Sequence, residues 1–223
     1  ILFPAPGTYT VTISPLTTGD DAVNGSDTGP WLTLYGGFRG EVAGRDTAFF
    51  AGAARLVGVT SFGDLGITAL SNAFADQTSF VDVPTTVPAG VTDLVGTFDG
   101  ATAFDDGDVG SWDVSAVTRM NSTFHGATSF NRRIDAWDVS SVTDMSRMFD
   151  RATVFDQPLA NWERADSTLG NVTEMDNMFE DADAFNQPIG NWDVSSVTDM
   201  DSMFEDALAF NQPIGTWNVS SVT

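Results

Sequence analysis

Residues 186–200, which read N-Q-P-I-G-N-W-D-V-S-S-V-T-D-M, decide the fold because this stretch returns along the chain in recognisable form. Its tryptophan recurs at steps of 25, 25, 30 and 25 residues, at Trp112, Trp137, Trp162, Trp192 and Trp217. A fixed period of this size is typical of stacked repeat units. The sequence therefore predicts a repeat array.

Two columns of phenylalanine follow the same period. The first holds Phe98, Phe124, Phe149, Phe179 and Phe204, and the second holds Phe104, Phe130, Phe155, Phe185 and Phe210. Both extend back to Phe74 and Phe80. We predict an array of about six or seven units over residues 56–223, truncated at its C-terminus, after an N-terminal β-rich cap over residues 1–55. The first residue is Ile1, so we interpret the chain as a segment of a longer protein.

Each unit combines two hydrophobic periodicities. Met145, Met148, Phe149 and Ala152 have the i, i+3, i+4, i+7 spacing of one face of a short helix. The pattern I-x-x-W-x-V-x-x-V over residues 189–197 has the spacing of a short strand in leucine-rich repeats. The expected fold is a right-handed α/β repeat solenoid of the leucine-rich-repeat type, with one short parallel strand and one short helix in each unit of about 25 residues.

Polar residues also recur with the period. Asn131, Asn186 and Asn211, with Asp156 in the same position, are expected to satisfy backbone groups of turns. A threonine column is predicted at the helix starts, where hydroxyls cap free N–H groups; it consists of Thr68, Thr92, Thr118, Thr143, Thr173, Thr198 and Thr223.

The motif over residues 186–200, together with M-F-x-x-A-x-x-F, resembles the bacterial surface protein repeat of about 25 residues, the DUF285 or BspA-like leucine-rich repeat. The resemblance covers about two-thirds of the chain. It implies a cell-surface or secreted protein used in adhesion or other binding. Residues 7–13, G-T-Y-T-V-T-I, resemble the last strand of a PKD-like β-sandwich.

Charge dominates the composition: 31 acidic residues against 9 arginines, with no lysine, give a net charge of −22. This balance argues against nucleic acid as a partner, and it resembles the composition of extreme halophiles. The chain has no cysteine, hence no disulfide or thiolate site, and no run of 18 apolar residues that predicts a transmembrane segment.

One acidic column is a candidate metal site. Asp113, Asp138 and Asp193 occupy one strand position with Glu163, so their carboxylates are expected to stack about 5 Å apart. Ca²⁺ bridging, hydrogen bonds from Ser140, Ser195 and Ser220, and screening by salt are three ways to relieve the repulsion. No other cofactor is predicted.

Other candidates point away from catalysis. The Trp and Met columns follow the repeat period and are interpreted as core. His125, the single histidine, aligns with Asp99, Asp150, Glu180 and Glu205 at a helix position expected to face solvent. Nearly every acid has an equivalent in the next unit, whereas a catalytic acid pair is singular. We therefore predict no enzyme activity.

The sequence leaves two functional hypotheses. One is an extracellular, cell-surface module that binds a protein or glycan partner. The other is a structural spacer, or a filament or surface-layer element that assembles with copies of itself. Acceptor patterns for N-glycosylation agree with an outside location; they begin at Asn24, Asn121, Asn171 and Asn218.

Overall fold

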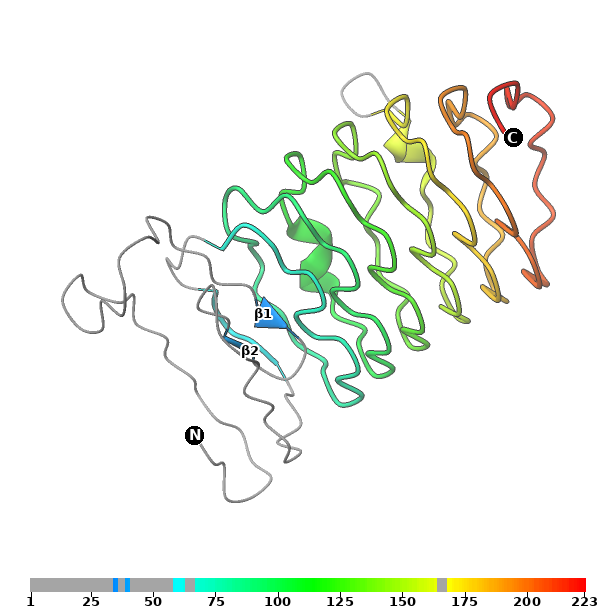
Figure 1. Cartoon of the computed structure of the whole chain (residues 1–223). Helices are drawn as coiled ribbons and strands as arrows, with labels where there is room; N and C mark the ends of the chain where they lie inside the picture. Colours follow the sequence, from blue (N-terminus) through cyan, green and yellow to red (C-terminus); the bar gives the residue numbers. More distant parts are fainter. Residues whose placement is uncertain (1–33, 36–38, 41–57, 63–66, 164–167) are drawn as a thin grey trace, which may run out of the picture.

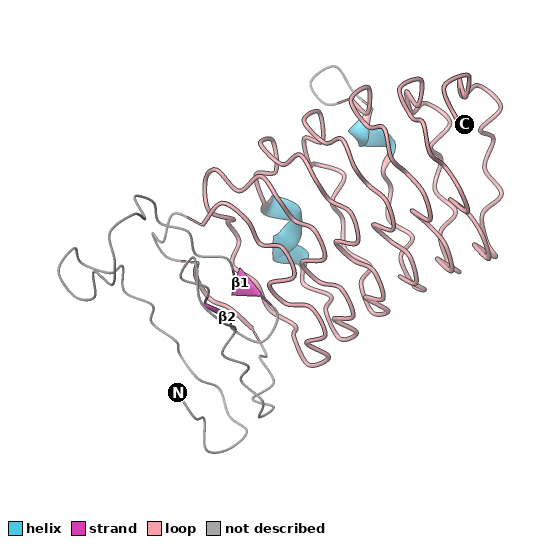
Figure 2. Cartoon of the chain, viewed as in Figure 1, coloured by secondary structure: helices cyan, strands magenta, loops and turns pink. Residues whose placement is uncertain are grey.

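Residues 67–163 and 168–223 form a stack of coils that lie side by side and follow one another toward the C-terminus (Figure 1). The computed structural model describes residues 34–35, 39–40, 58–62, 67–163 and 168–223. Strands β1 (Leu34–Tyr35) and β2 (Arg39–Gly40) pair antiparallel. Two 3₁₀ helices follow, η1 (Gly107–Ser111) and η2 (Ala160–Trp162). Turns, bends and single bridges make up the rest of the described residues (Figure 2).

The predicted α/β repeat solenoid is wrong, since the described units contain no α-helix. The stretch predicted as a helix from Met145 to Ala152 is a succession of turns. Its backbone N–H groups donate to the carbonyl three residues earlier, as from Met148 to Met145 at 3.2 Å and from Ala152 to Phe149 at 2.9 Å. Arg147 and Arg151 have φ angles of 56° and 59°. An α-helix requires right-handed backbone throughout, so two left-handed residues exclude it.

A pair of left-handed residues four positions apart recurs in each unit. The pairs are Asn72 and Asp76, Gly96 and Gly100, Ser122 and Gly126, Arg147 and Arg151, Asn177 and Asp181, and Ser202 and Asp206. The residues between each pair form turns, and the apolar members of the run point inward. We call this segment of each unit the turn run.

The predicted parallel sheet is also wrong for the described units. Neighbouring units meet through isolated parallel bridges, which join Gly58 to Asp82 and connect Ala69, Asp93, Arg119, Asp144, Glu174 and Asp199 in turn. Alternate N–H groups of each turn run before the last donate to the next unit, as from Phe149 to Met178 at 2.9 Å and from Arg151 to Glu180 at 2.8 Å. These hydrogen bonds take the place of the bonds between strands of a parallel sheet. Backbone hydrogen bonds between units therefore hold the stack together, and those within a unit form its turns.

The core consists of aromatic stacks, as the sequence predicts. Within one unit the rings of Phe124 and Phe130 lie 4.0 Å apart, and Phe124 stacks on Phe149 of the next unit at 5.7 Å. These side chains are fully buried, and burial of each contributes about 1.5–3 kcal/mol. Buried Trp and Met side chains line the same core, which confirms their interpretation as core residues.

Tryptophan also links successive units by hydrogen bonds. The indole N–H of Trp137 donates to the carbonyl of Val109 at 3.0 Å, and that of Trp162 donates to Ile134 at 3.0 Å. Trp112, Trp192 and Trp217 make the equivalent bond to Pro84, Leu159 and Ile189. One residue per unit therefore supplies both apolar area and a bond along the stack.

The predicted asparagine column satisfies turns as expected. The Asn131 Oδ1 atom accepts from the backbone N–H of Asp156 at 3.0 Å, and the Asn186 Oδ1 atom accepts from that of Asn211 at 2.9 Å. The role predicted for threonine is wrong, because the described units have no α-helix to cap. Instead the hydroxyls of Thr92, Thr118, Thr143, Thr173 and Thr198 each donate to the carbonyl of the preceding threonine, as from Thr143 to Thr118 at 3.1 Å.

The PKD-like strand predicted over residues 7–13 and most of the cap predicted over residues 1–55 lie outside the described residues. Within the part of the chain that the structure describes, no helix has the length and hydropathy needed to cross a membrane.

Candidate functional site

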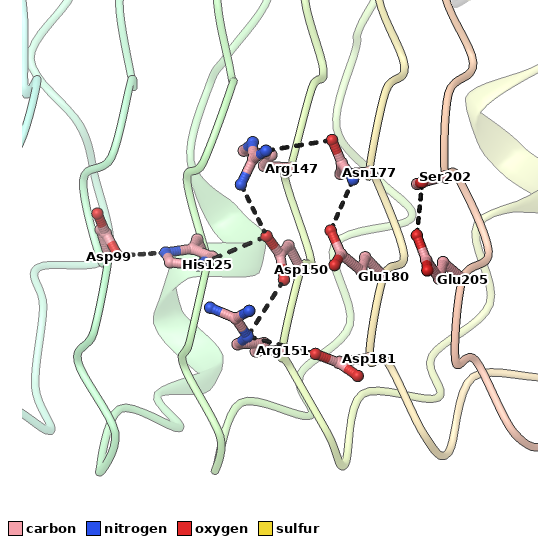
Figure 3. Close-up of polar contacts among 10 residues, drawn as sticks. All are labelled: Asp99, His125, Arg147, Asp150, Arg151, Asn177, Glu180, Asp181, Ser202 and Glu205. Atoms are coloured by element: carbon pink, nitrogen blue, oxygen red, sulfur yellow. Dashed lines mark hydrogen bonds and ion pairs between the residues drawn. The ribbon is translucent and has the colours of Figure 1, made fainter.

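One polar column contains the single histidine of the chain. Asp99, His125, Asp150, Glu180 and Glu205 occupy the position directly before the second left-handed residue of their turn runs, and we call them the central column (Figure 3). The prediction that this position faces solvent is wrong for His125 and Asp150. The Asp150 side chain is 0% exposed and the His125 side chain 26% exposed. The missing helix explains the difference, because neighbouring turn runs enclose this position.

His125 lies between carboxylates of the preceding and following units. Its Nδ1 atom is 2.6 Å from Asp99 Oδ1, and its Nε2 atom is 3.5 Å from Asp150 Oδ2 (Figure 3). The hydrogen bond to Asp99 is the largest cause that raises the pKa of His125 above 6.5, and the charges of Asp99 and Asp150 add to it. These contacts favour the imidazolium form.

Asp150 is a buried carboxylate surrounded by cationic side chains at long distances. Arg147 Nη1 lies 3.5 Å from Asp150 Oδ2, and Arg151 Nε lies 3.9 Å from Asp150 Oδ1. Within the described residues, Asp150 Oδ1 and His125 Nε2 are buried atoms with no hydrogen-bond partner. Burial is the main cause that raises the pKa of Asp150 above 3.8. A buried charge held only by long contacts is sensitive to loss of any one of them.

Further along the central column, each acid is held by the first left-handed residue of its own unit. Asn177 Nδ2 donates to Glu180 Oε2 at 2.6 Å, and Ser202 Oγ donates to Glu205 Oε2 at 2.6 Å (Figure 3). Arg147 and Asn177 are linked at 3.3 Å. The network thus joins neighbouring units, and its geometry suits cohesion of the stack.

A second column follows the bridge positions Asp93, Arg119, Asp144, Glu174 and Asp199. Arg119 pairs with Asp93 and separates it from Asp144. Beyond Asp144 this column contains no basic residue. There, carboxylate oxygens of Glu174, Asp176 and Asp199 lie within 4.8 Å of one another, a spacing that could hold a cation. The sequence prediction did not identify this group, although the signal, an unbroken run of acids in one column, was present.

The predicted Ca²⁺ residues each bind a serine of their own unit. The Oδ1 atoms of Asp113, Asp138 and Asp193 accept from the hydroxyl two residues ahead at 2.7, 2.6 and 2.6 Å. These serine bonds lower the pKa of Asp113 and Asp193 below 3.8. The structure therefore matches the serine alternative, and Ca²⁺ binding by this column stays a prediction.

The glycosylation patterns differ in their surroundings. Thr123, which completes the pattern of Asn121, is fully buried and donates to Met120. Asn171 is exposed, with its Nδ2 atom bonded to the Ser140 carbonyl at 2.7 Å. Asn218 is exposed, and Asn24 lies outside the described residues. Glycosylation of these asparagines stays a prediction.

Comparison with known families gives one match. The family model described as "Mycoplasma protein of unknown function, DUF285" matches residues 68–169 and 166–223. The two matched segments together span the repeat units from the first threonine of the column onward. No curated protein matches the chain.

Proposed function

Because the chain belongs to the DUF285 family, whose function is unknown, we propose that it is a non-catalytic binding module of an extracellular, cell-surface protein. Its partner would be a protein or a glycan that contacts a repeated, acid- and hydroxyl-rich face. The likeness to BspA-like surface repeats supports this proposal and its extracellular location.

The supporting observation is that the exposed polar groups recur in equivalent positions. Thr118, Thr143 and Thr198 are exposed, and their hydroxyls make the same bond to the preceding unit. The neighbouring acids Asp113 and Asp193 are exposed and fixed by identical serine bonds. A regular, pre-ordered array of this kind suits many weak contacts with one extended partner.

Binding to an array of immobilised glycans and to intact bacterial and animal cells would test the proposal. Substituting Thr118→Arg and Thr198→Arg together places two bulky cations on the threonine face, and we expect binding to fall at least tenfold. The control is Ser129→Arg with Asp183→Arg, two exposed positions outside the threonine column, which adds one more positive charge than the test pair. Equal binding by both double variants, or no binding by the parent chain, would contradict the proposal.

The alternative is a structural spacer or a self-assembling element. The regular stack favours it, since backbone bonds of the same kind recur between successive units. Light scattering with circular dichroism, with and without Ca²⁺ and from low to molar salt, separates the two. A folded monomer at all conditions favours the binding module. A molar mass that increases with protein concentration favours assembly.

A further inference from the structure

His125 interrupts a column of carboxylates that stacking would otherwise bring together. Parallel backbone pairing sets adjacent units about 4.8 Å apart. At that spacing an acid at position 125 would lie next to Asp99 on one side and Asp150 on the other. The imidazole instead contacts both, at 2.6 and 3.5 Å.

The charged groups around His125 come from three units. Asp99 belongs to the preceding unit, and Asp150, Arg147 and Arg151 belong to the following one; Glu180 lies one unit further and faces Asp150. Asp99 keeps its side chain 38% exposed, whereas Asp150 is fully buried. Solvent can therefore compensate for loss of a partner at Asp99 but not at Asp150.

We propose that His125 is a proton-dependent clamp that joins its unit to the following one through Asp150. An imidazolium carries a proton on both nitrogens, so it donates to Asp99 and attracts Asp150 simultaneously. A neutral imidazole that keeps its Nδ1 proton for Asp99 presents the Nε2 lone pair to the Asp150 carboxylate, which is repulsive. This device is independent of the binding function proposed above.

We expect the contact between His125 and Asp150 to open as the pH rises above the pKa of His125. The pKa of His125 is raised in the folded protein, so its contribution to stability is complete below about pH 6.5, the unfolded value, and is lost as the pH rises through the folded pKa. Burial raises the pKa of Asp150 above 3.8, and the charge of His125 opposes that rise. The ionic contact is therefore closed in the pH window in which Asp150 is ionised and His125 is still protonated.

The contact at stake includes backbone bonds between the two units. N–H groups of Ser122, Phe124 and Gly126 donate to the following unit at 2.9, 3.0 and 2.7 Å. The equivalent bonds of Asn177, Phe179 and Asp181, at 2.8, 2.9 and 2.9 Å, join two units that have no histidine between them. The second set is an internal control within the same molecule.

The test combines an NMR titration with amide hydrogen exchange of the whole chain. Because the chain has one histidine, its imidazole signal needs no assignment, and we expect it to titrate above pH 6.5. Across that titration the protection factors of the Ser122, Phe124 and Gly126 amides should fall about tenfold, the order expected when one contact to a charged group is lost. Those of the control set should stay constant.

The variant His125→Gln should show low protection at these three amides both below and above the pH range in which His125 titrates in the parent chain. A histidine that titrates at or below pH 6.5, or equal changes in protection at the two sets of amides, would overturn the proposal. Should the variant not fold, the titration and exchange of the parent chain decide the question without it.

Discussion

At the position of Asn131, Asp156 and Asn186, a side-chain oxygen of one unit accepts two hydrogen bonds from the next. The Asn186 Oδ1 atom accepts from the N–H of Asn211 at 2.9 Å and from Gln212 Nε2 at 3.0 Å. Asp156 makes the same pair of bonds to Asn186 and Gln187. Acceptance by a side-chain oxygen is therefore what this position requires, whether the group is an amide or a carboxylate.

Removing that oxygen should destabilise the protein. The substitution Asn186→Ala leaves the Asn211 N–H and one Gln212 donor without their partner; water can reach both, so we expect a loss of about 0.5–1.5 kcal/mol in the free energy of unfolding. The substitution Asn186→Asp retains the acceptor, as Asp156 does naturally, and should cost well under half as much. Urea denaturation measures both. Equal losses for the two variants would show that the oxygen is not what matters.

At the residue scale the sequence is informative where a residue repeats. The asparagine and tryptophan columns were predictable because each member makes the same contact with its neighbour. His125 was not, since it occurs once and its burial depends on Asp150 and the arginines of another unit. No local pattern encodes such a neighbourhood.

At the scale of the element, the i, i+3, i+4, i+7 spacing is ambiguous. Turns bonded from i to i+3 place apolar residues inward with the same spacing as a helix, and Met145, Met148, Phe149 and Ala152 satisfy both. A signal against the helix was present elsewhere in the array. Gly96 and Gly100, four residues apart, and Asn72 and Asp76 are residue types that favour left-handed backbone. Arginine at positions 147 and 151 obscured the pattern.

Substitution by alanine should have opposite effects on stability at Gly126, which has left-handed backbone, and at Gly107, which does not. Gly126 has a φ of +63°, and a Cβ there meets neighbouring atoms only at 3.6 Å, so backbone strain alone should make Gly126→Ala destabilising by about 1–2 kcal/mol. Gly107, in η1, has no such φ, and no atom lies within 4 Å of the place that a Cβ would take. Gly107→Ala should be neutral or stabilising by up to about 1 kcal/mol. Thermal unfolding of both variants checks this, and a stable Gly126→Ala protein would refute it.

At the scale of the whole molecule, the net charge of −22 opposes compaction. In the described units, Arg119, Arg132, Arg133, Arg147 and Arg151 all pair with aspartates. They leave most carboxylates without a cationic partner, including the group of Glu174, Asp176 and Asp199. Dissolved cations must then supply the remaining compensation.

We expect the melting temperature to rise by roughly 5 °C or more between 0.05 and 1 M NaCl, because the screening length falls to about 3 Å at 1 M. Pure screening predicts equal stabilisation by NaCl, MgCl₂ and CaCl₂ at matched ionic strength. Stabilisation by Ca²⁺ below about 1 mM would instead indicate direct coordination. In that case Glu174→Gln, compared with Asp113→Asn, identifies which acidic group binds the ion. A melting temperature that falls with salt would contradict the screening argument.

The hydrogen bonds between turn runs have a mechanical consequence. They join one unit to the next along the stack, so tension applied between the first and last units loads successive interfaces in series. The weakest interface yields first, and units should peel away singly. Each release of a 25-residue unit would lengthen the chain by roughly 80 Å, given about 3.3–3.6 Å for each extended residue. The molecule would respond to pulling as an extensible tether that yields in regular steps.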